Sequence, residues 1–435
     1  MTTIPTVPGP RWWTTLQIAR DPFRTYLKLR KAYGDTFIVR AINGDVVVTA
    51  DPNLIRDLFR ARTHEVAPFR VEAAEPLLGR QSLLVVSGDQ HRRERELLTP
   101  PFHGRRMHAY GQIMQDAAER ATAHFRPGAN IVLSDVFLTI SLDVIVRAVF
   151  GMVDPAAQQR WEAAIRTLVK SILPAALFAP VLQFSMFGLS PWDRFIAARD
   201  RFDALIVETI AHRRATNERG PDLLSLMLDA TYDDGSPMTD RAIRDELVTM
   251  LFAGHETTQI AMAWAVYRLL QRPDALERLL AELDASDGAP ETLATLPWLD
   301  AVVQETLRLQ PIVPDIVRTL TVDLELGGHA FAAGTHVAPV AALVHARDDL
   351  FPDPDAFRPE RFVDHTFRPW ELLPFGGGVR RCIGAALATW EMKVVLGTVL
   401  PRWSFALRGP ERAVRRNITM GPKHGVRVTV CGPRV

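Results

Sequence analysis

A glycine-rich segment that ends in a single cysteine carries the strongest chemical signal in the sequence. Residues 374–384 read PFGGGVRRCIG. Three successive glycines let the backbone fold tightly and present amide hydrogens to the sulfur of Cys382. The helix expected from residue 385, with Arg380 and Arg381, favours the thiolate over the thiol. The segment therefore predicts a thiolate that acts either as a nucleophile or as a metal ligand.

Polar residues also interrupt a long apolar helix. Thr239 or Asp240 can cap a helical pattern that runs without proline to Gln271, roughly 48 Å in length. Residues 247–253 are apolar on every face, which indicates a buried central helix. Gly254, Glu256 and Thr257 follow. They favour either a packing notch with outward polar groups or a widened groove in which a hydroxyl and an acid pass protons.

Two charge patterns lie on other predicted helices. Glu305 and Arg308 are spaced i,i+3, and His91 and Arg95 are spaced i,i+4, so each pair shares one helix face. Taken alone, either pattern is typical of a solvated surface.

Together these segments resemble the cytochrome P450 family of haem-thiolate monooxygenases. The residues on the fixed positions of its haem-ligand signature are Phe375, Gly378, Arg380, Cys382 and Gly384. The resemblance implies that Cys382 is the axial ligand of the iron in haem b. It also implies that the cofactor-binding residues include Phe375, Gly376, Gly384 and Ala253.

The resemblance assigns further roles. Thr257 is the alcohol and Glu256 the acid that deliver protons to dioxygen bound opposite Cys382. The haem propionates are held by His91, Arg95, Arg318 and Arg380. Oxygen is then inserted into a substrate by hydroxylation or epoxidation, with two electrons supplied from outside.

A third set of residues is implied to be structural. In this family Glu305 and Arg308 are buried and joined by the arginine of a Pro-Glu-Arg-Phe segment, here Arg361. The sequence departs from the family pattern at His345, which leaves the role of His345 open. No role is assigned to His255 or Cys431.

The residues that fall where the family lines its substrate pocket are mostly apolar: Phe252, Ala253, Val313, Ile316, Val317 and Met420. A hydrophobic small molecule is therefore favoured. A fatty acid and a terpenoid remain equal alternatives. The loop expected at 62–88 and the apolar segment 171–192 are further candidates for specificity.

Two rival functions stay open. A peroxide-driven or rearranging haem-thiolate enzyme needs no proton relay, so Glu256 and Thr257 argue against it. A haem-based binding or sensing protein without turnover can be distinguished from a monooxygenase only by measuring substrate-dependent consumption of NAD(P)H.

Composition limits the other classes. The 435 residues have a formal net charge of +1, which gives no general attraction to nucleic acid. Two cysteines indicate a reducing compartment, and cytoplasmic is the default. The first residues lack the pattern of a signal peptide or membrane anchor. Residues 171–192 are uncharged over 22 positions, but prolines interrupt them, so a lid or buried hairpin is favoured over a membrane span.

The expected fold is mainly α with a small β part, a single P450 haem domain over 1–435 after a Pro-rich lead at 1–20. The β elements are a hairpin around Asn43-Gly44 and strands at 319–326 and 330–337. Helices are expected at 89–124, broken at Pro100-Pro101, and at 385–400.

No reductase is fused within this sequence, so the electrons of NAD(P)H are expected from a separate ferredoxin and ferredoxin reductase, and the protein is expected to be a monomer. Arg92 and Arg93, near the haem-binding helix, and Arg381, beside Cys382, predict a basic docking surface for an acidic ferredoxin.

Overall fold

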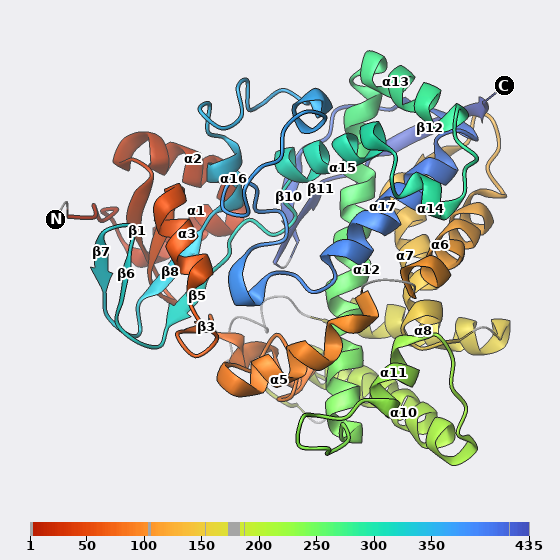
Figure 1. Cartoon of the computed structure of the whole chain (residues 1–435), viewed down its shortest axis with the longest axis horizontal. Coiled ribbons are helices and arrows are strands. Elements are labelled where there is room, and N and C mark those ends of the chain that lie inside the picture. Colours follow the sequence, from red (N-terminus) through yellow and green to blue (C-terminus); the bar gives the residue numbers. More distant parts are fainter. Residues whose placement is uncertain are drawn as a thin grey trace. The chain divides into compact units, whose positions relative to one another are not determined.

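The computed structural model describes residues 3–102, 106–152, 154–172, 183–186, 188–416 and 418–434. The chain divides into two compact units. The β unit comprises Met1–Phe69, Ala118–Phe137 and Thr257–Val435, and the helical unit comprises Arg70–Ala117 and Leu138–Glu256. The boundary falls inside the continuous helix α12 (Asp240–Leu270), the long green ribbon of Figure 1.

The largest sheet lies in the β unit and has the strand order β1-β2-β8-β5-β3. Its strands are β1 (Thr36–Ala41), β2 (Gly44–Thr49), β8 (His336–Pro339), β5 (Arg318–Leu320) and β3 (Val66–Pro68). The predicted first hairpin is confirmed, with a shift of one residue. Ala41 pairs with Gly44, so Ile42 and Asn43 form the turn and Gly44 begins the second strand.

The predicted strands 319–326 and 330–337 are each broken in two. Their inner halves, β6 (Leu324–Leu326) and β7 (His329–Phe331), pair across Gly327-Gly328, while the outer halves join the large sheet as β5 and β8. Both glycines have positive φ, which the tight turn requires. Strands β10 (Ala413–Arg416) and β11 (Thr419–Pro422) form a two-stranded sheet. A three-stranded sheet has the order β4 (Asn130–Val132), β12 (Arg427–Pro433), β9 (Trp403–Leu407).

Side-chain caps fix the starts of two early helices. Asp21 accepts the N–H of Arg24 before α2, and Asp51 accepts the N–H of Asn53 before α3. The helices of the β unit are α1 (Arg11–Arg20), α2 (Pro22–Tyr33), α3 (Pro52–Arg60), α13 (Pro273–Asp284), α14 (Pro290–Leu293), α15 (Pro297–Leu309), α16 (Ala341–His345) and α17 (Ala385–Val399). The last confirms the helix predicted from residue 385.

The helical unit holds α4 (Glu75–Leu78), α5 (Gly88–Leu98), α8 (Pro155–Ser171), α10 (Pro191–Thr216) and α11 (Leu223–Asp229). Helices α6 (Arg106–Thr122) and α7 (Leu133–Ala148) cross into the β unit. The predicted break between α5 and α6 is confirmed. The prediction that 62–88 is loop throughout is wrong, because β3, a 3₁₀ turn at Val71–Ala74 and α4 lie within it. Half of the apolar segment 171–192, residues 173–182 and 187, lies outside the described residues.

Helix α12 begins as the sequence predicts. The Thr239 hydroxyl accepts the N–H of Ala242 at 3.1 Å, and the helix is 31 residues long. Its residues from Asp245 to Leu251 are buried. No helix among the described residues is long and apolar enough to cross a membrane.

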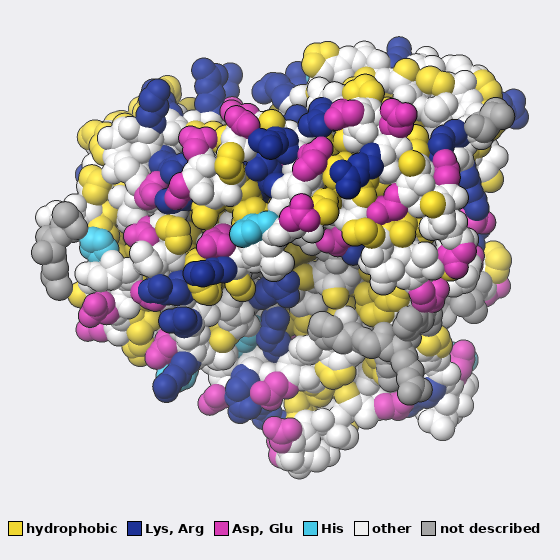
Figure 2. Space-filling model, turned by 45° about the horizontal axis from the view of Figure 1, so that its top comes forward, with side chains coloured by type: hydrophobic (Ala, Val, Ile, Leu, Met, Phe, Trp, Pro, Cys, Tyr) yellow, Lys and Arg dark blue, Asp and Glu magenta, His cyan; other side chains and the backbone are white. Residues whose placement is uncertain are grey.

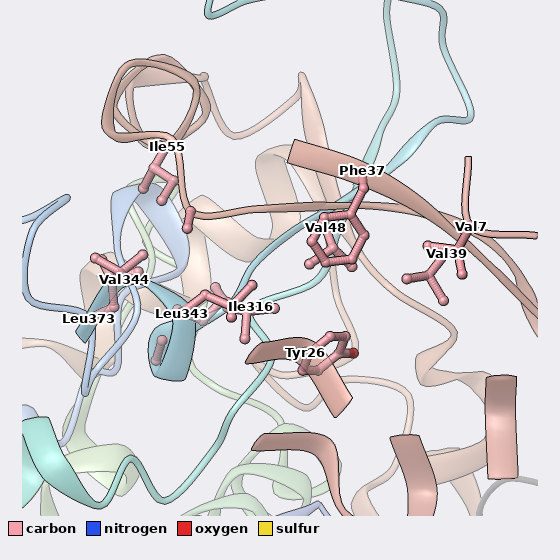
Figure 3. Close-up of a cluster of buried hydrophobic side chains, with 13 residues drawn as sticks. Val7, Tyr26, Phe37, Val39, Val48, Ile55, Ile316, Leu343, Val344 and Leu373 are labelled. Atoms are coloured by element: carbon pink, nitrogen blue, oxygen red, sulfur yellow. The ribbon is translucent and has the colours of Figure 1, made fainter. Parts of the chain in front are cut away.

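Apolar packing holds each unit together. In the β unit, Phe37, Val48, Leu343 and Val344 come from the sheet and from α16, and they pack around Tyr26 of α2 (Figure 3). In the helical unit, rings from three segments pack edge to face or tilted: Phe150, Trp161 and Phe202. On the face drawn in Figure 2, basic and acidic side chains are interspersed, as the net charge of +1 suggests.

Candidate functional site

The loop before Cys382 is built by close backbone packing within the β unit. Gly376 and Gly378 have φ of +62° and +65°. A Cβ on Gly378 would lie 2.7 Å from the carbonyl oxygen of Phe59 at the end of α3, so a larger residue does not fit. The N–H of Cys382 donates to the Phe375 carbonyl at 2.9 Å.

The Cys382 side chain is exposed and unbridged. Gly384 is the N-cap residue of α17, so the thiol lies three positions before the first residue of that helix. Positive potential at the helix start and from Arg381, which is exposed, favours the thiolate. The loop therefore offers an accessible sulfur of the kind that binds a soft metal.

Arg318 is a half-buried guanidinium in the same unit. It donates to the carbonyls of Val317 and Arg380, at 3.0 and 3.5 Å, and makes no ion pair with a described acid. Desolvation lowers the pKa of Arg318 to about 10, which leaves it charged at neutral pH. A partly desolvated cation without an acidic partner among the described residues suits an anionic ligand group.

Helix α12 carries an accessible stripe in its middle. Phe252, Glu256 and Thr257 are half-buried and Ala253 is exposed. Leu251, His255 and Thr258 lie between them and are buried. The accessible positions recur at i, i+3 and i+4, so they share one face of the helix. The stripe crosses the unit boundary, with Thr257 as the first residue on the β-unit side.

The packing beside Gly254 accounts for the glycine. A Cβ there would approach the Ile145 side chain to 3.2 Å, which is tighter than usual contact. His255 is buried and its Nδ1 lies 2.7 Å from the Leu251 carbonyl, so the His255 ring serves the helix packing.

His91 and Arg95 lie on α5 in the helical unit. His91 is 2% exposed and Arg95 is half-buried. Arg318 and Arg380, the other two predicted propionate contacts, belong to the β unit. Their roles stay predictions.

Glu305, Arg308 and Arg361 form the buried network that the sequence predicts. The Arg308 guanidinium meets both Glu305 oxygens at 2.6 and 2.8 Å, and Arg361 Nε meets Glu305 Oε1 at 3.2 Å. Arg308 also donates to the carbonyls of His345, Pro354 and Ala356. All five donor hydrogens of Arg308 can therefore be matched by acceptors.

Sequence reasoning missed the role of His345. Its Nδ1–H donates to the Arg308 carbonyl at 2.9 Å, and its Nε2 accepts the N–H of Leu373 at 2.8 Å. Burial lowers the pKa of His345 to about 3, so the ring is neutral at pH 7. His345 connects the charged network to the residue that precedes the Cys382 loop. Its departure from the family pattern was the available signal.

The predicted substrate-pocket residues differ in exposure. Val313 and Val317 are half-buried, while Ile316 and Met420 are 8% and 2% exposed. Ile316 belongs to the core cluster of Figure 3 and faces Gly376 of the Cys382 loop. The Met420 N–H donates to the Ile312 carbonyl at 2.7 Å, which ties strand β11 to the same segment.

Comparison with known proteins decides the family. The family model described as cytochrome P450 matches residues 4–426. The chain belongs to the cytochrome P450 family. It is 34% identical to cytochrome P450 135B1 of Mycobacterium tuberculosis over 98% of this chain and 92% of the relative. It is also 34% identical to cytochrome P450 138 of the same species, over 98% and 96%.

Solved P450 structures share the fold. Retinoic acid bound cyanobacterial CYP120A1 has a TM-score of 0.85 at 26% identity and covers 98% of both chains. The cytochrome P450DA heme domain has a TM-score of 0.84 at 23% identity and covers 99% of this chain and 97% of its own. The mainly helical P450 fold and the monooxygenase activity predicted from the sequence are thereby confirmed.

P450 membership implies a haem, and the β unit fits one. The accessible Cys382 at a helix start would supply an iron ligand, and half-buried Arg318 would supply a cation for a propionate.

Proposed function

We propose that this P450 monooxygenase hydroxylates or epoxidises a hydrophobic small molecule, with Cys382 as the residue that would ligate the iron of haem b. The observation that carries the proposal is the combination of an exposed thiol on a glycine-shaped loop with a half-buried arginine in the same unit that pairs with no described acid. The propionates are assigned to His91, Arg95, Arg318 and Arg380. The remaining haem contacts are assigned to Phe375, Gly376, Gly384 and Ala253.

Bound haem supplies the reduction and cleavage of dioxygen, and the thiolate donates the electron density that favours it. Cys382 stays a thiolate because its sulfur lies before α17 with Arg381 adjacent. The Thr257 hydroxyl holds a proton on the accessible face of α12, and the Glu256 carboxyl one position earlier replenishes it. The half-buried state of both side chains supports this role.

A terpenoid or a fatty acid is the proposed substrate class. Retinoic acid, bound in the CYP120A1 structure, is an isoprenoid with a carboxyl end, and so supports both alternatives. The assigned lining residues are apolar: Phe252, Ala253, Val313, Ile316, Val317 and Met420. The charge of nearby Asp315 is offset by Arg415 at 3.3 Å.

We also propose that NAD(P)H delivers electrons through a separate ferredoxin and ferredoxin reductase to a monomeric, cytoplasmic protein. Exposed Arg381 beside the thiolate supports docking of an acidic donor. Two unbridged cysteines, Cys382 and Cys431, suit a reducing compartment.

The test is the reduced carbon monoxide spectrum. Wild-type protein should show the red-shifted Soret band of a thiolate-bound haem, and Cys382→His should lose that band. Cys431→Ser is the matched control, since Cys431 is also an exposed thiol but lies on β12. A histidine-type spectrum for the wild type would exclude the assignment.

Thr257→Ala tests the proton route. Haem and substrate binding should be kept, while reducing equivalents are diverted from product to hydrogen peroxide. The ratio of product to NADPH consumed measures this. An unchanged ratio would remove Thr257 from the mechanism, and consumption unaffected by any tested terpenoid or fatty acid would exclude the substrate class.

A further inference from the structure

The segment between α4 and α5 is fastened to α12 inside the helical unit. We refer to residues 79–87 as the strap. The N–H of Gln81 donates to Asp245 Oδ2 at 3.0 Å, and the hydroxyls of Ser82 and Thr249 are hydrogen-bonded at 2.6 Å. A Cβ on Gly79 would overlap the Asp245 carboxyl at 2.0 Å, so the approach requires glycine. The strap therefore contacts two successive turns of α12.

Glu246 lies between these fastenings and is 0% exposed. Neither of its carboxyl oxygens has a side-chain hydrogen-bond partner among the described residues. Burial is the main reason that its pKa is raised well above the usual value, and the charges of Glu94 and Asp245 raise the pKa further. The Leu83 backbone of the strap acts in the opposite direction.

Glu94 reaches the same region from α5 and is 5% exposed. Its Oε1 accepts the Tyr232 hydroxyl at 2.7 Å, while Oε2 makes no hydrogen bond with a described residue. Arg93 lies over the Tyr232 ring at 4.6 Å and pairs with Asp234 at 2.8 Å. Burial raises the pKa of Glu94, and Tyr232 and Arg93 act against this.

These surroundings decide which carboxyl holds a proton. Glu94 has a hydroxyl donor and a nearby guanidinium, so it ionises first. The neighbouring Asp245 has Arg244 at 2.9 Å. Glu246 has no cation partner among the described residues, and burying its charge without one costs several kcal/mol. Glu246 is therefore neutral while the strap is closed.

We propose that Glu246 is a positioning residue whose proton holds the strap closed on α12, beside the substrate side of that helix. The proposal rests on the proposed function, because Phe252 and Ala253 of the accessible stripe begin one turn after Thr249 on α12. Ionised Glu246 would face Glu94 and Asp245 in a buried space. Opening the strap admits water to that carboxyl.

The sign of the pH effect follows from linkage. Opening returns the pKa of Glu246 toward its ordinary value, so the closed state binds the proton more tightly. Closure is strongest below the ordinary Glu pKa and weakens as pH rises through the raised pKa of Glu246. One linked proton changes the closing equilibrium by up to about tenfold per pH unit.

Hydrogen exchange of the holoenzyme tests the strap without turnover. The probes are the amides of Gln81 and Val85, the latter bonded to the Ser82 carbonyl at 2.8 Å. Buried glutamates with pKa values of about 8–9 are known, so the scan should extend from about pH 6 to about pH 10. Protection, corrected for intrinsic exchange, should fall with rising pH in the wild type.

Four variants distinguish the effect of the Glu246 proton on strap closure from the effect of side-chain packing. Glu246→Gln should make protection independent of pH, and Glu94→Gln should move the transition to lower pH. Thr249→Val should lower protection equally at every pH. Glu96→Gln is the matched control, because Glu96 is an exposed acid of the same helix α5, and its profile should equal that of the wild type. A pH-independent wild type, or an unchanged slope in Glu246→Gln, would overturn the proposal.

Carbon monoxide rebinding to the reduced haem tests the connection to the substrate side. The gas is uncharged, so its own state does not vary with pH. The rebinding rate should rise with pH in the wild type and stay constant in Glu246→Gln. Carbon monoxide rebinding rates that stay constant with pH, while hydrogen exchange of the strap changes with pH, would refute the placement of the strap beside the substrate. A protein without the thiolate spectrum would instead refute the proposed function and leave the exchange result standing.

Discussion

Two buried glutamates in the two units meet opposite surroundings. Glu305 in the β unit and Glu246 in the helical unit are both 0% exposed. Glu305 is bonded by Arg308, by Arg361 and by the N–H of Arg358. Glu246 has no side-chain hydrogen-bond partner among the described residues and has Glu94 and Asp245 as charged neighbours. The cost of removing a carboxylate from water is similar, but only Glu305 has cations to offset it.

The comparison separates a fixed support from an adjustable one. Arg308 also bonds three carbonyls and connects through His345 to Leu373, so the network holds the backbone that leads to Cys382. Here two guanidinium groups compensate the carboxylate of Glu305. At Glu246 a bound proton neutralises the carboxyl group, so this compensation depends on pH.

The largest effect is expected from breaking the compensated network. Arg308→Ala leaves Glu305 buried beside Arg361 alone and should cost about 3–5 kcal/mol of unfolding free energy. We expect haem-free or insoluble protein. Haem content and urea unfolding measure this.

Arg358→Ala is the control for Arg308. The Arg358 side chain pairs only with exposed Asp353 among the described residues, at 2.8 Å, and its N–H to Glu305 survives the substitution. A loss of about 0–1 kcal/mol is expected. Equal losses in the two variants would mean that burial of the network contributes nothing.

The next test exchanges each glutamate for glutamine. Glu305→Gln leaves Arg308 and Arg361 without a charge partner and should cost about 1.5–3 kcal/mol, the range for hydrogen bonds to charged groups. Glu246→Gln should instead gain stability over the wild type as pH rises from about 4.3, the ordinary Glu pKa, toward the raised pKa of Glu246. Unfolding measured across pH should give opposite signs. A loss in both variants would contradict the comparison.

The sequence predicted the compensated network better than the uncompensated pair. Glu305 and Arg308 are three residues apart on one helix, so the helical period alone brings them together, and Arg361 follows from the family resemblance. Glu94 and Glu246 lie 152 positions apart on two helices. Their proximity depends on how α5 packs against α12, which no local pattern encodes. The bond from His345 to Leu373 is equally remote in sequence.

The positions of the helices and strands show the same difference between local and long-range signals. The cap at Thr239 and the Asn43-Gly44 turn are local signals, and both were placed within one residue. The long strands predicted after Arg318 were split, because β5 and β8 pair in the large sheet while β6 and β7 form their own hairpin. Strand pairing with distant partners decided that outcome, and hydrophobic alternation could not.

A smaller effect is expected at Arg318, which differs from Arg308 in having no acidic partner among the described residues. Arg318→Leu removes a partly desolvated charge, so unfolding of the haem-free protein should be unchanged or slightly more favourable to the fold. Haem retention should weaken by about 1.5–3 kcal/mol if a propionate bonds this guanidinium. Haem transfer to an acceptor protein measures retention. A transfer rate in Arg318→Leu equal to that of the wild type would remove Arg318 from the cofactor contacts.

The smallest effect concerns the predicted docking surface for a ferredoxin, where charges are exposed and already paired. Arg92 lies 3.2 Å from Glu96 and is 49% exposed, and Arg93 pairs with Asp234. Such pairs contribute about 0–1 kcal/mol to stability, so Arg92→Glu should leave unfolding nearly unchanged. Arg92 is the better position to replace, because Arg93 also contacts Tyr232 and hence the Glu94 region.

If an acidic donor docks on this part of α5, first-electron transfer should slow with added salt, since exposed charges are screened over about 10 Å at 0.1 M. It should slow further in Arg92→Glu and keep the wild-type rate in Arg160→Glu, an exposed arginine of α8 that is paired in the same way with Glu208 at 2.9 Å. Equal rates in both variants would place docking elsewhere, with Arg381 beside the thiolate as the next residue to replace.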